Sequence, residues 1–137
     1  MKHAELLEFL RSHKLAVEAS VTTDGTPQAA VVGYAVTDDL ELVFDTLEST
    51  RKFHNLSTDP RIALVVGWGD VTVQIEGLAD FPLGPELDRL QGVYFAAYPD
   101  GRERLAWPGL TYARVRPRWV RYSDYGQEPP VIEEMTL

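Results

Sequence analysis

Residues 44–66 read FDTLESTRKFHNLSTDPRIALVV and run from the end of one predicted strand, through a short helix, into another strand. The apolar spacing between Ser49 and Ser57 predicts the helix, and Asp59-Pro60 ends it because a residue before proline avoids helical backbone. The run RIALVV that follows is almost continuously apolar, which predicts a strand buried on both faces. A helix N-terminus is therefore expected directly after a strand.

Hydroxyl and cationic side chains surround the start of this helix. Thr46, Ser49 and Thr50 come first, and Arg51 and Lys52 follow them. A helix N-terminus has unpaired N–H groups and a partial positive charge, so it attracts phosphate, and Arg and Lys add charged donors. The alternative is ordinary: Ser49 or Thr50 caps the helix, and the two cations lie in solvent. These residues alone give the two interpretations about equal weight.

Alternating strands flank the stretch on both sides. Residues 15–36 contain two such runs around the turn Asp24-Gly25-Thr26-Pro27, and a turn at residues 37–39 leads to a third. Residues 70–81 and 111–125 add strands after the helix. With RIALVVGW this makes six strands joined mostly by short turns. Such a pattern predicts a small closed or partly closed antiparallel barrel, because closure removes exposed strand edges.

Two further helices and a tail lie outside the six strands. Residues 1–13 have helical apolar spacing, and residues 86–98 predict a second longer helix that stops at Asp100-Gly101. Residues 126–137 form an acidic tail that contains prolines. A chain of 137 residues is most simply one domain with its own core, so we expect residues 1–137 to fold together.

Composition restricts the possible functions. The formal net charge is −8, which disfavours nucleic acid and anionic membranes as partners, although one local basic site remains possible. Cysteine is absent, so disulfides and thiolate chemistry are excluded. No apolar run approaches the roughly 20 residues of a membrane span, and acidic residues interrupt the N-terminal segment. A cytoplasmic location is the default expectation.

Side chains with an obvious catalytic role are hard to find. His3, His13 and His54 do not have the spacing of metal ligands, and no metal site is expected. The aromatic residues are numerous, and Trp107 and Trp119 are candidates for a pocket or a subunit interface. A phosphate-like site without catalytic side chains suggests that a bound cofactor carries the chemistry.

Four segments together resemble the pyridoxamine 5′-phosphate oxidase-like family of FMN-binding split barrels. They are FDTLESTRKFHNLSTDPRIALVV, VTVQIEG, YFAAYPDGRERLAW and WPGLTYARVRPRWVRYSD, and the resemblance covers about residues 10–125. It implies a mainly β fold, a six-stranded antiparallel split β-barrel with short flanking helices. It also implies a homodimer with FMN at the subunit interface.

The resemblance implies roles for particular residues. Arg51 and Lys52 fall where the family binds the FMN phosphate, and Thr72 falls where a glutamine contacts FMN. Backbone groups of residues 30–33 would face the isoalloxazine ring. Including the candidate pocket aromatic Trp107, the predicted cofactor-binding residues are Ala30, Val31, Val32, Asp45, Thr46, Ser49, Thr50, Arg51, Lys52, Thr72 and Trp107.

The chain also departs from the family pattern. Ala30 and Ala35 stand where the oxidases have an arginine and a lysine, and Tyr98 replaces the arginine that binds the substrate phosphate. Ser123 replaces a tryptophan, and the basic C-terminal segment is missing. These departures affect the vitamin B6 substrate site more than the FMN phosphate site.

Three functions follow as hypotheses. The first is a homodimeric FMN-dependent oxidoreductase acting on a small redox substrate that the sequence does not identify. The second is a reductase of the same fold that uses the deazaflavin F420. The third is a non-catalytic flavin- or haem-binding protein, for which His54 is a conceivable iron ligand.

Overall fold

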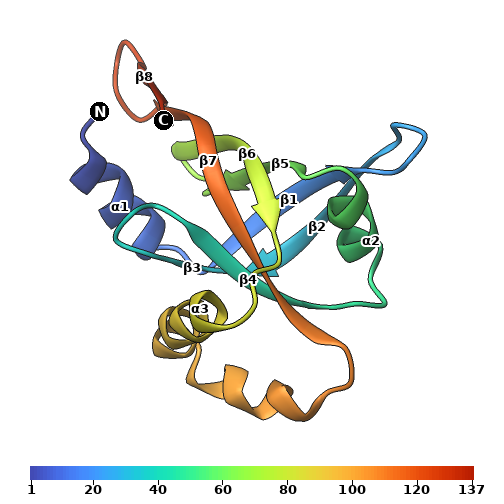
Figure 1. Ribbon diagram of the computed structural model, residues 1–137. Coiled ribbons are helices and arrows are strands. Elements are labelled where there is room, and N and C mark those ends of the chain that lie inside the picture. The colour runs from blue at the N-terminus through green and yellow to red at the C-terminus, as the bar shows by residue number, and fades with distance from the viewer.

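One curled antiparallel sheet dominates the computed structural model, which describes residues 1–137 (Figure 1). Its strands are β1 (Leu15–Val21), β2 (Pro27–Gly33), β3 (Ala35–Val36), β4 (Leu42–Leu47), β5 (Arg61–Val66), β6 (Val71–Asp80), β7 (Leu110–Asp124) and β8 (Val131–Thr136). The helices are α1 (His3–Arg11), α2 (Arg51–Thr58), α3 (Pro85–Ala97) and the 3₁₀ segment η1 (Pro99–Ala106). None of these helices combines the length and the apolar character that crossing a membrane requires.

The order of the strands explains how the sheet curls. They follow one another as β2-β1-β5-β6-β7-β4-β3, and β8 pairs with β7 outside this path. The first and last strands of that order, β2 and β3, are separated only by Tyr34. The two ends of the sheet therefore belong to one short stretch of chain, which bends the sheet round on itself. This confirms the predicted split β-barrel, in which residues 27–36 form a broken strand rather than a single one.

The core lies inside the curled sheet. Phe44, Leu64 and Ile75 are fully buried there, and Leu6 and Leu10 of α1 complete the same cluster. Burial of each such side chain stabilises the fold by roughly 1.5–3 kcal/mol. A smaller cluster lies on the other face of β4, where Leu90, Tyr94 and Phe95 of α3 pack on Val43 and Tyr112. This second cluster holds α3 and η1 beneath the sheet in the view of Figure 1.

One sequence-based expectation was wrong in detail. Strand β5 is not buried on both faces: it alternates, with Ile62, Leu64 and Val66 buried and Val65 38 % exposed. The reason is that the curled sheet encloses only its inner face, so an apolar run on the outer face stays uncovered. The sequence also did not predict that residues 131–136 of the acidic tail form a strand, β8.

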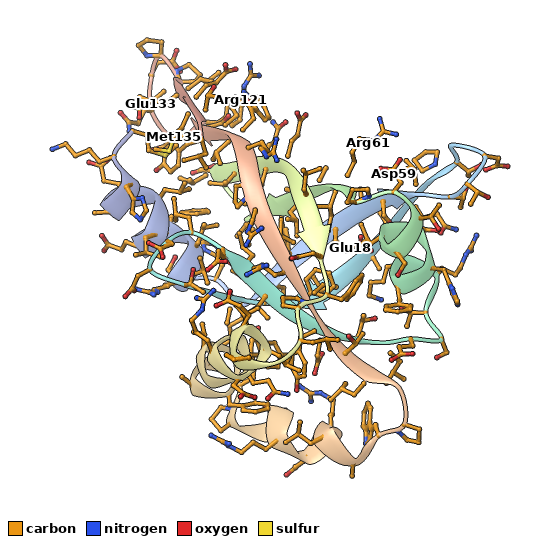
Figure 2. The ribbon with its side chains drawn as sticks, viewed as in Figure 1. Glu18, Asp59, Arg61, Arg121, Glu133 and Met135 are labelled. Carbon is orange, nitrogen blue, oxygen red and sulfur yellow. The ribbon has the colours of Figure 1, made fainter.

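Strand β8 is held to β7 by backbone pairing and by charge. Arg121 Nη2 lies 2.5 Å from Glu134 Oε1, and the N-terminal amine of Met1 lies 2.6 Å from Glu133 Oε2. Figure 2 shows Glu133 and Met135 of β8 beside Arg121 of β7. Two acidic residues of the tail thus pair with Arg121 of β7 and with the N-terminal amine, an arrangement that local sequence patterns do not reveal.

Gly77 sits at a bulge where β6 and β7 shift register between Glu76 and Gly77. A Cβ atom on Gly77 would overlap the Arg116 backbone oxygen, which cannot move away freely. We expect Gly77→Ala to lower the free energy of unfolding by about 1–3 kcal/mol, measured by chemical denaturation. The control is Gly92→Ala on the exposed side of α3, where a Cβ meets nothing within 4 Å. That change should be neutral or add up to about 1 kcal/mol. Equal effects of the two substitutions would contradict the packing argument.

Candidate functional site

The turn between β4 and α2 is fixed by two threonine hydroxyls. Thr50 is the N-cap of α2, and its Oγ1 accepts from the Phe53 N–H at 3.3 Å. The same hydroxyl donates to the Leu47 carbonyl at 2.8 Å and lies 2.9 Å from Thr46 Oγ1. Because the single Thr50 hydrogen goes to Leu47, Thr46 is the donor in the second contact. The two hydroxyls therefore orient the first turn of α2 relative to the sheet.

A polar network continues from this turn into the barrel wall. The Gln28 amide on β2 lies 2.7 Å from Arg51 Nε and 2.7 Å from the Asn55 amide. A guanidinium carries only donors, so the amide oxygen of Gln28 faces Arg51. Asn55 is buried on α2, and its amide lies 3.1 Å from the hydroxyl of Ser20 on β1. The network fixes Arg51 through a neutral partner and leaves its positive charge uncompensated.

These residues line a cavity of about 410 Å³ between α2 and strands β1 and β2. The lining consists of Glu18, Ser20, Gln28, Ala29, Ala30, Ser49, Thr50, Arg51 and Lys52. Six arginines and the N-terminal amine form the chain's ion pairs, whereas Arg51 and Lys52 belong to none of them. Lys2, Lys14, Arg102, Arg116 and Arg118 also form no ion pair, but Arg51 and Lys52 are adjacent and line one cavity together. Their position at a helix N-terminus is typical of a phosphate site.

Glu18 is the acidic member of this cavity. Its side chain is 1 % exposed, and its Oε2 atom has no hydrogen-bond partner. Figure 2 labels Glu18 in the middle of the molecule, on the strand that packs against α2. Burial raises the pKa of the Glu18 carboxyl group, and the nearby Lys52 ammonium partly opposes that rise. The site thus contains two cations and a carboxyl group that resists ionisation.

The raised pKa of Glu18 predicts a pH-dependent stability of the ligand-free protein. The unfolded chain releases this proton near the ordinary pKa of 4.5, while the folded protein retains it to higher pH. The folded state therefore binds more protons in that window, so the free energy of unfolding falls as pH rises above about 4.5 and levels off above the folded pKa. Denaturant titrations at several pH values should show this decline in the wild type and a smaller one in Glu18→Gln. Parallel curves for the two proteins would rule out the assigned cause.

Of the three predicted residues on β2, Ala30 and Val32 share one face of the strand and Val31 lies on the other. Ala30 lines the cavity, Val32 points into the core, and Val31 on the opposite face is 62 % exposed. Strand β2 pairs with β1 only, so its other edge has no strand partner and presents backbone N–H and C=O groups. This open edge is where a planar ligand can meet backbone donors and acceptors.

Three other predicted residues lie apart from the cavity lining. Asp45 faces η1, where its Oδ2 accepts from Arg104 Nε at 2.7 Å. Thr72 is paired across the sheet with Ser123. Trp107 follows η1 and is 52 % exposed. The structure gathers Ala30, Ser49, Thr50, Arg51 and Lys52 around one cavity and holds Thr46 against Thr50.

Five members of the site were not predicted from the sequence: Glu18, Ser20, Gln28, Ala29 and Asn55. One signal was available, because Ala16, Glu18 and Ser20 alternate on β1 and share its buried face. A glutamate at a position where alternation predicts burial is informative, since buried charges are rare without a partner. Gln28 and Asn55 carry no such signal, because their meeting depends on how α2 packs on the sheet.

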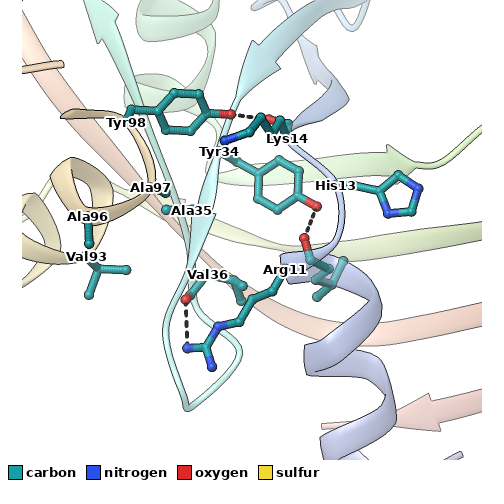
Figure 3. A pocket seen from close by; sticks show the side chains of 11 residues that line it. Arg11, His13, Lys14, Tyr34, Ala35, Val36, Val93, Ala96, Ala97 and Tyr98 are labelled. Atoms are coloured by element: carbon teal, nitrogen blue, oxygen red, sulfur yellow. Dashed lines mark hydrogen bonds between the residues drawn. The ribbon is translucent and has the colours of Figure 1, made fainter. Parts of the chain in front are cut away.

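A second cavity, of about 400 Å³, lies between α1, β3 and α3 (Figure 3). Its walls are mostly apolar. Arg11 Nη2 donates to the Val36 carbonyl at 3.3 Å and to Asp38 at 2.7 Å, and the Tyr98 hydroxyl donates to the Lys14 carbonyl. Lys14 is the one cation of this lining without an ion pair, and its Nζ lies 5.2 Å from the centroid of the Tyr98 ring. This cavity therefore offers space for an apolar group but lacks the adjacent pair of cations that Arg51 and Lys52 provide.

Fold and site together define a split β-barrel with a cavity at one helix N-terminus that two adjacent cations line. The family model described as pyridoxamine 5′-phosphate oxidase matches residues 3–124. The chain therefore belongs to the pyridoxamine 5′-phosphate oxidase family. It is 32 % identical over 124 residues to the pyridoxine/pyridoxamine 5′-phosphate oxidase of Burkholderia cenocepacia (strain HI2424). That match covers 82 % of this chain and 56 % of the enzyme, so the chain spans about half the length of this curated relative.

Solved structures agree on the fold. A haem-binding protein from Mycobacterium smegmatis superposes with a TM-score of 0.84 at 22 % identity, over 99 % of this chain and 58 % of that one. A pyridoxamine 5′-phosphate oxidase-related, FMN-binding protein from Nostoc punctiforme PCC 73102 gives 0.71 at 14 % identity, over 98 % and 93 % of the two chains. At 22 % and 14 % identity these structures support the split-barrel fold and do not identify a ligand of this chain.

Proposed function

We propose that the protein binds FMN, with the phosphate held by Arg51 and Lys52, and acts as a flavin-dependent oxidoreductase. The observation that carries the proposal is the pair of cations at the N-terminus of α2, which line a cavity and have no carboxylate partner. The lining of the cavity suits the phosphate group of FMN. It supplies two positive charges, the Ser49 hydroxyl and the first N–H groups of a helix.

The residues of this chain would bind and orient the cofactor. Arg51 offers a planar set of donors that Gln28 holds in place, and Lys52 offers a mobile point charge. The open edge of β2 near Ala30 could meet the polar rim of a flavin ring. FMN itself supplies hydride or electron transfer when bound, so no side chain needs to act as nucleophile.

A homodimer is part of the proposal. Leu15, Val31 and Val65 of neighbouring strands are 45 %, 62 % and 38 % exposed, which leaves apolar side chains on the outside of the β2-β1-β5 part of the sheet. Exposed apolar groups gathered on one surface suit a subunit interface. A second subunit there would lie beside β2 and could complete the wall around a flavin.

The vitamin B6 substrate is not part of the proposal. Ala35 is buried and carries no charge, and the Tyr98 hydroxyl donates to the Lys14 carbonyl. Two of the three positions where the family has cations therefore hold a small apolar side chain and a hydroxyl that is already engaged, and the second of these is the position of the substrate-phosphate arginine. We infer a small redox substrate that lacks a phosphate at this position.

F420 and haem are the competing ligands. F420 has a polyanionic tail, which a chain of net charge −8 would repel outside the local cavity. Haem needs an axial ligand, and His54 is exposed on α2, close to the cavity assigned to phosphate. The fold shared with the Mycobacterium smegmatis haem-binding protein justifies including haem in the test.

The experiment is a direct comparison of ligands. Purified protein would be titrated with FMN, F420 and haemin, followed by visible absorption and fluorescence, and the FMN complex would then be offered NADH and NADPH. The proposal expects FMN to bind most tightly and to be reduced with turnover of an acceptor. Tight FMN binding without reduction by any donor would favour a binding role, and preference for F420 or haemin would overturn the cofactor assignment.

A further inference from the structure

Glu18 lies on the inner face of β1 and lines the cavity that contains Arg51 and Lys52. Its Oε2 atom is buried without a hydrogen-bond partner, which is costly for a carboxylate and needs an explanation. The cost falls if a donor enters the cavity and bonds to this atom, or if the carboxyl group takes up a proton and loses its charge, in which case its O–H needs an acceptor.

The surroundings of Glu18 distinguish these two possibilities. Its cross-strand neighbours are Ala30 on β2 and Leu64 on β5, which are uncharged. Arg51 and Lys52 on α2 are the charged side chains of its cavity. Lys52 favours the ionised carboxyl group, but burial opposes ionisation more strongly. In the ligand-free protein the protonation state of Glu18 therefore depends on the Lys52 ammonium, which is the group that opposes the effect of burial.

A phosphate in this cavity would change that balance. It would bring negative charge close to Glu18 and would take up the positive charge of Lys52 and Arg51. Both effects disfavour the ionised carboxylate, because a like charge approaches while the opposite charge becomes engaged. A protonated carboxyl group, by contrast, can donate a hydrogen bond to a phosphate oxygen.

We propose that Glu18 takes up a proton from solvent when a phosphate group enters the cavity, and that its carboxyl group then donates a hydrogen bond to a phosphate oxygen. The inference rests on the phosphate site proposed above and adds a specific role for a residue that is not a cation. Glu18 thereby makes phosphate binding proton-linked: affinity weakens as pH rises through the range in which the free and bound proteins differ in protonation.

The test compares the pH dependence of FMN binding in the wild type, in Glu18→Gln and in Glu76→Gln, an exposed glutamate on β6 that serves as control. Dissociation constants would be measured by flavin fluorescence between about pH 5.5 and about pH 8.5. The phosphate of FMN has its own pKa near 6, but it affects all three proteins alike. Wild type and Glu76→Gln should lose about tenfold more affinity across this range than Glu18→Gln, since one pKa unit corresponds to a tenfold change.

A second measurement counts protons directly. Calorimetry of FMN binding near pH 7, in two buffers with different protonation enthalpies, is done on the wild type and on Glu18→Gln, because the phosphate of FMN can exchange a proton and does so in both proteins. The inference expects the wild type to take up more protons than Glu18→Gln. FMN binding with coincident pH profiles in wild type and Glu18→Gln, or with equal proton counts in these two proteins, would overturn the role of Glu18 alone. Failure of FMN to bind at every pH would instead overturn the proposed function, and the inference with it.

Discussion

Replacing Arg51 and Lys52 together by alanine should weaken FMN binding by about a hundredfold and leave riboflavin binding nearly unchanged. Hydrogen bonds to charged groups contribute about 1.5–3 kcal/mol each. Two of them that share one phosphate should therefore contribute about 3 kcal/mol in all, and each 1.4 kcal/mol is tenfold in affinity. Riboflavin has the same ring but no phosphate, so it separates a phosphate site from general damage to the cavity.

The control for this double variant removes the same charge elsewhere. Lys2→Ala with Arg102→Ala changes the net charge equally, and both residues are exposed and outside the cavity lining. Affinities would be measured by flavin fluorescence at more than one salt concentration, because long-range attraction is screened by salt whereas direct contacts persist better. A similar loss of FMN affinity in both double variants would mean that the effect comes from net charge alone. No loss of affinity in either variant would contradict the assignment of a phosphate site.

Arg114→Ala should be the most destabilising single substitution on β7. Arg114 is 5 % exposed, and its guanidinium reaches three carboxylates: Asp80 at 2.6 Å, Glu86 at 2.6 Å and Glu41 at 3.4 Å. Removing it leaves Asp80 without a cation, whereas Glu41 and Glu86 keep Arg89 as a partner at 2.9 Å and 3.0 Å. Breaking a buried ion pair in this way costs about 3–5 kcal/mol, and we expect the lower end because Asp80 and Glu86 are half-exposed.

Arg121→Ala is the matched control for Arg114, on the same strand. Its pair with Glu134 is exposed on both sides, 41 % and 48 %, and exposed pairs contribute about 0–1 kcal/mol. Chemical denaturation of both variants measures the difference. If Arg121→Ala costs as much as Arg114→Ala, then burial does not decide the strength of these pairs in this protein.

The sequence predicted the fold because its strands carry strong local signals. Alternation over residues 70–81 and the turn at residues 24–27 correspond to β6 and to the hairpin between β1 and β2. The errors arose where tertiary structure decides. An apolar run does not show which face of β5 the curled sheet encloses, and an acidic segment does not show that Arg121 and the N-terminus will pair with it.

The residues of the candidate site also fall into two groups, those that the sequence predicted and those that it did not. Thr46, Ser49, Thr50, Arg51 and Lys52 are neighbours in sequence, so a capped helix after a strand was enough to bring them together. Glu18, Gln28 and Asn55 come from three elements, and only the packing of α2 on β1 and β2 brings them to the same place. Asp45 shows the converse: it is adjacent to Thr46 in sequence, yet strand alternation turns it toward Arg104 instead.

The most direct test of the account compares FMN with riboflavin on the unmodified protein. The two ligands share the flavin ring and differ in the phosphate, so the ratio of their dissociation constants measures what the cavity at the start of α2 contributes. Titration by fluorescence near neutral pH should show FMN binding about a hundredfold more tightly than riboflavin. Equal affinities for the two flavins would contradict the assignment of Arg51 and Lys52 as a phosphate site.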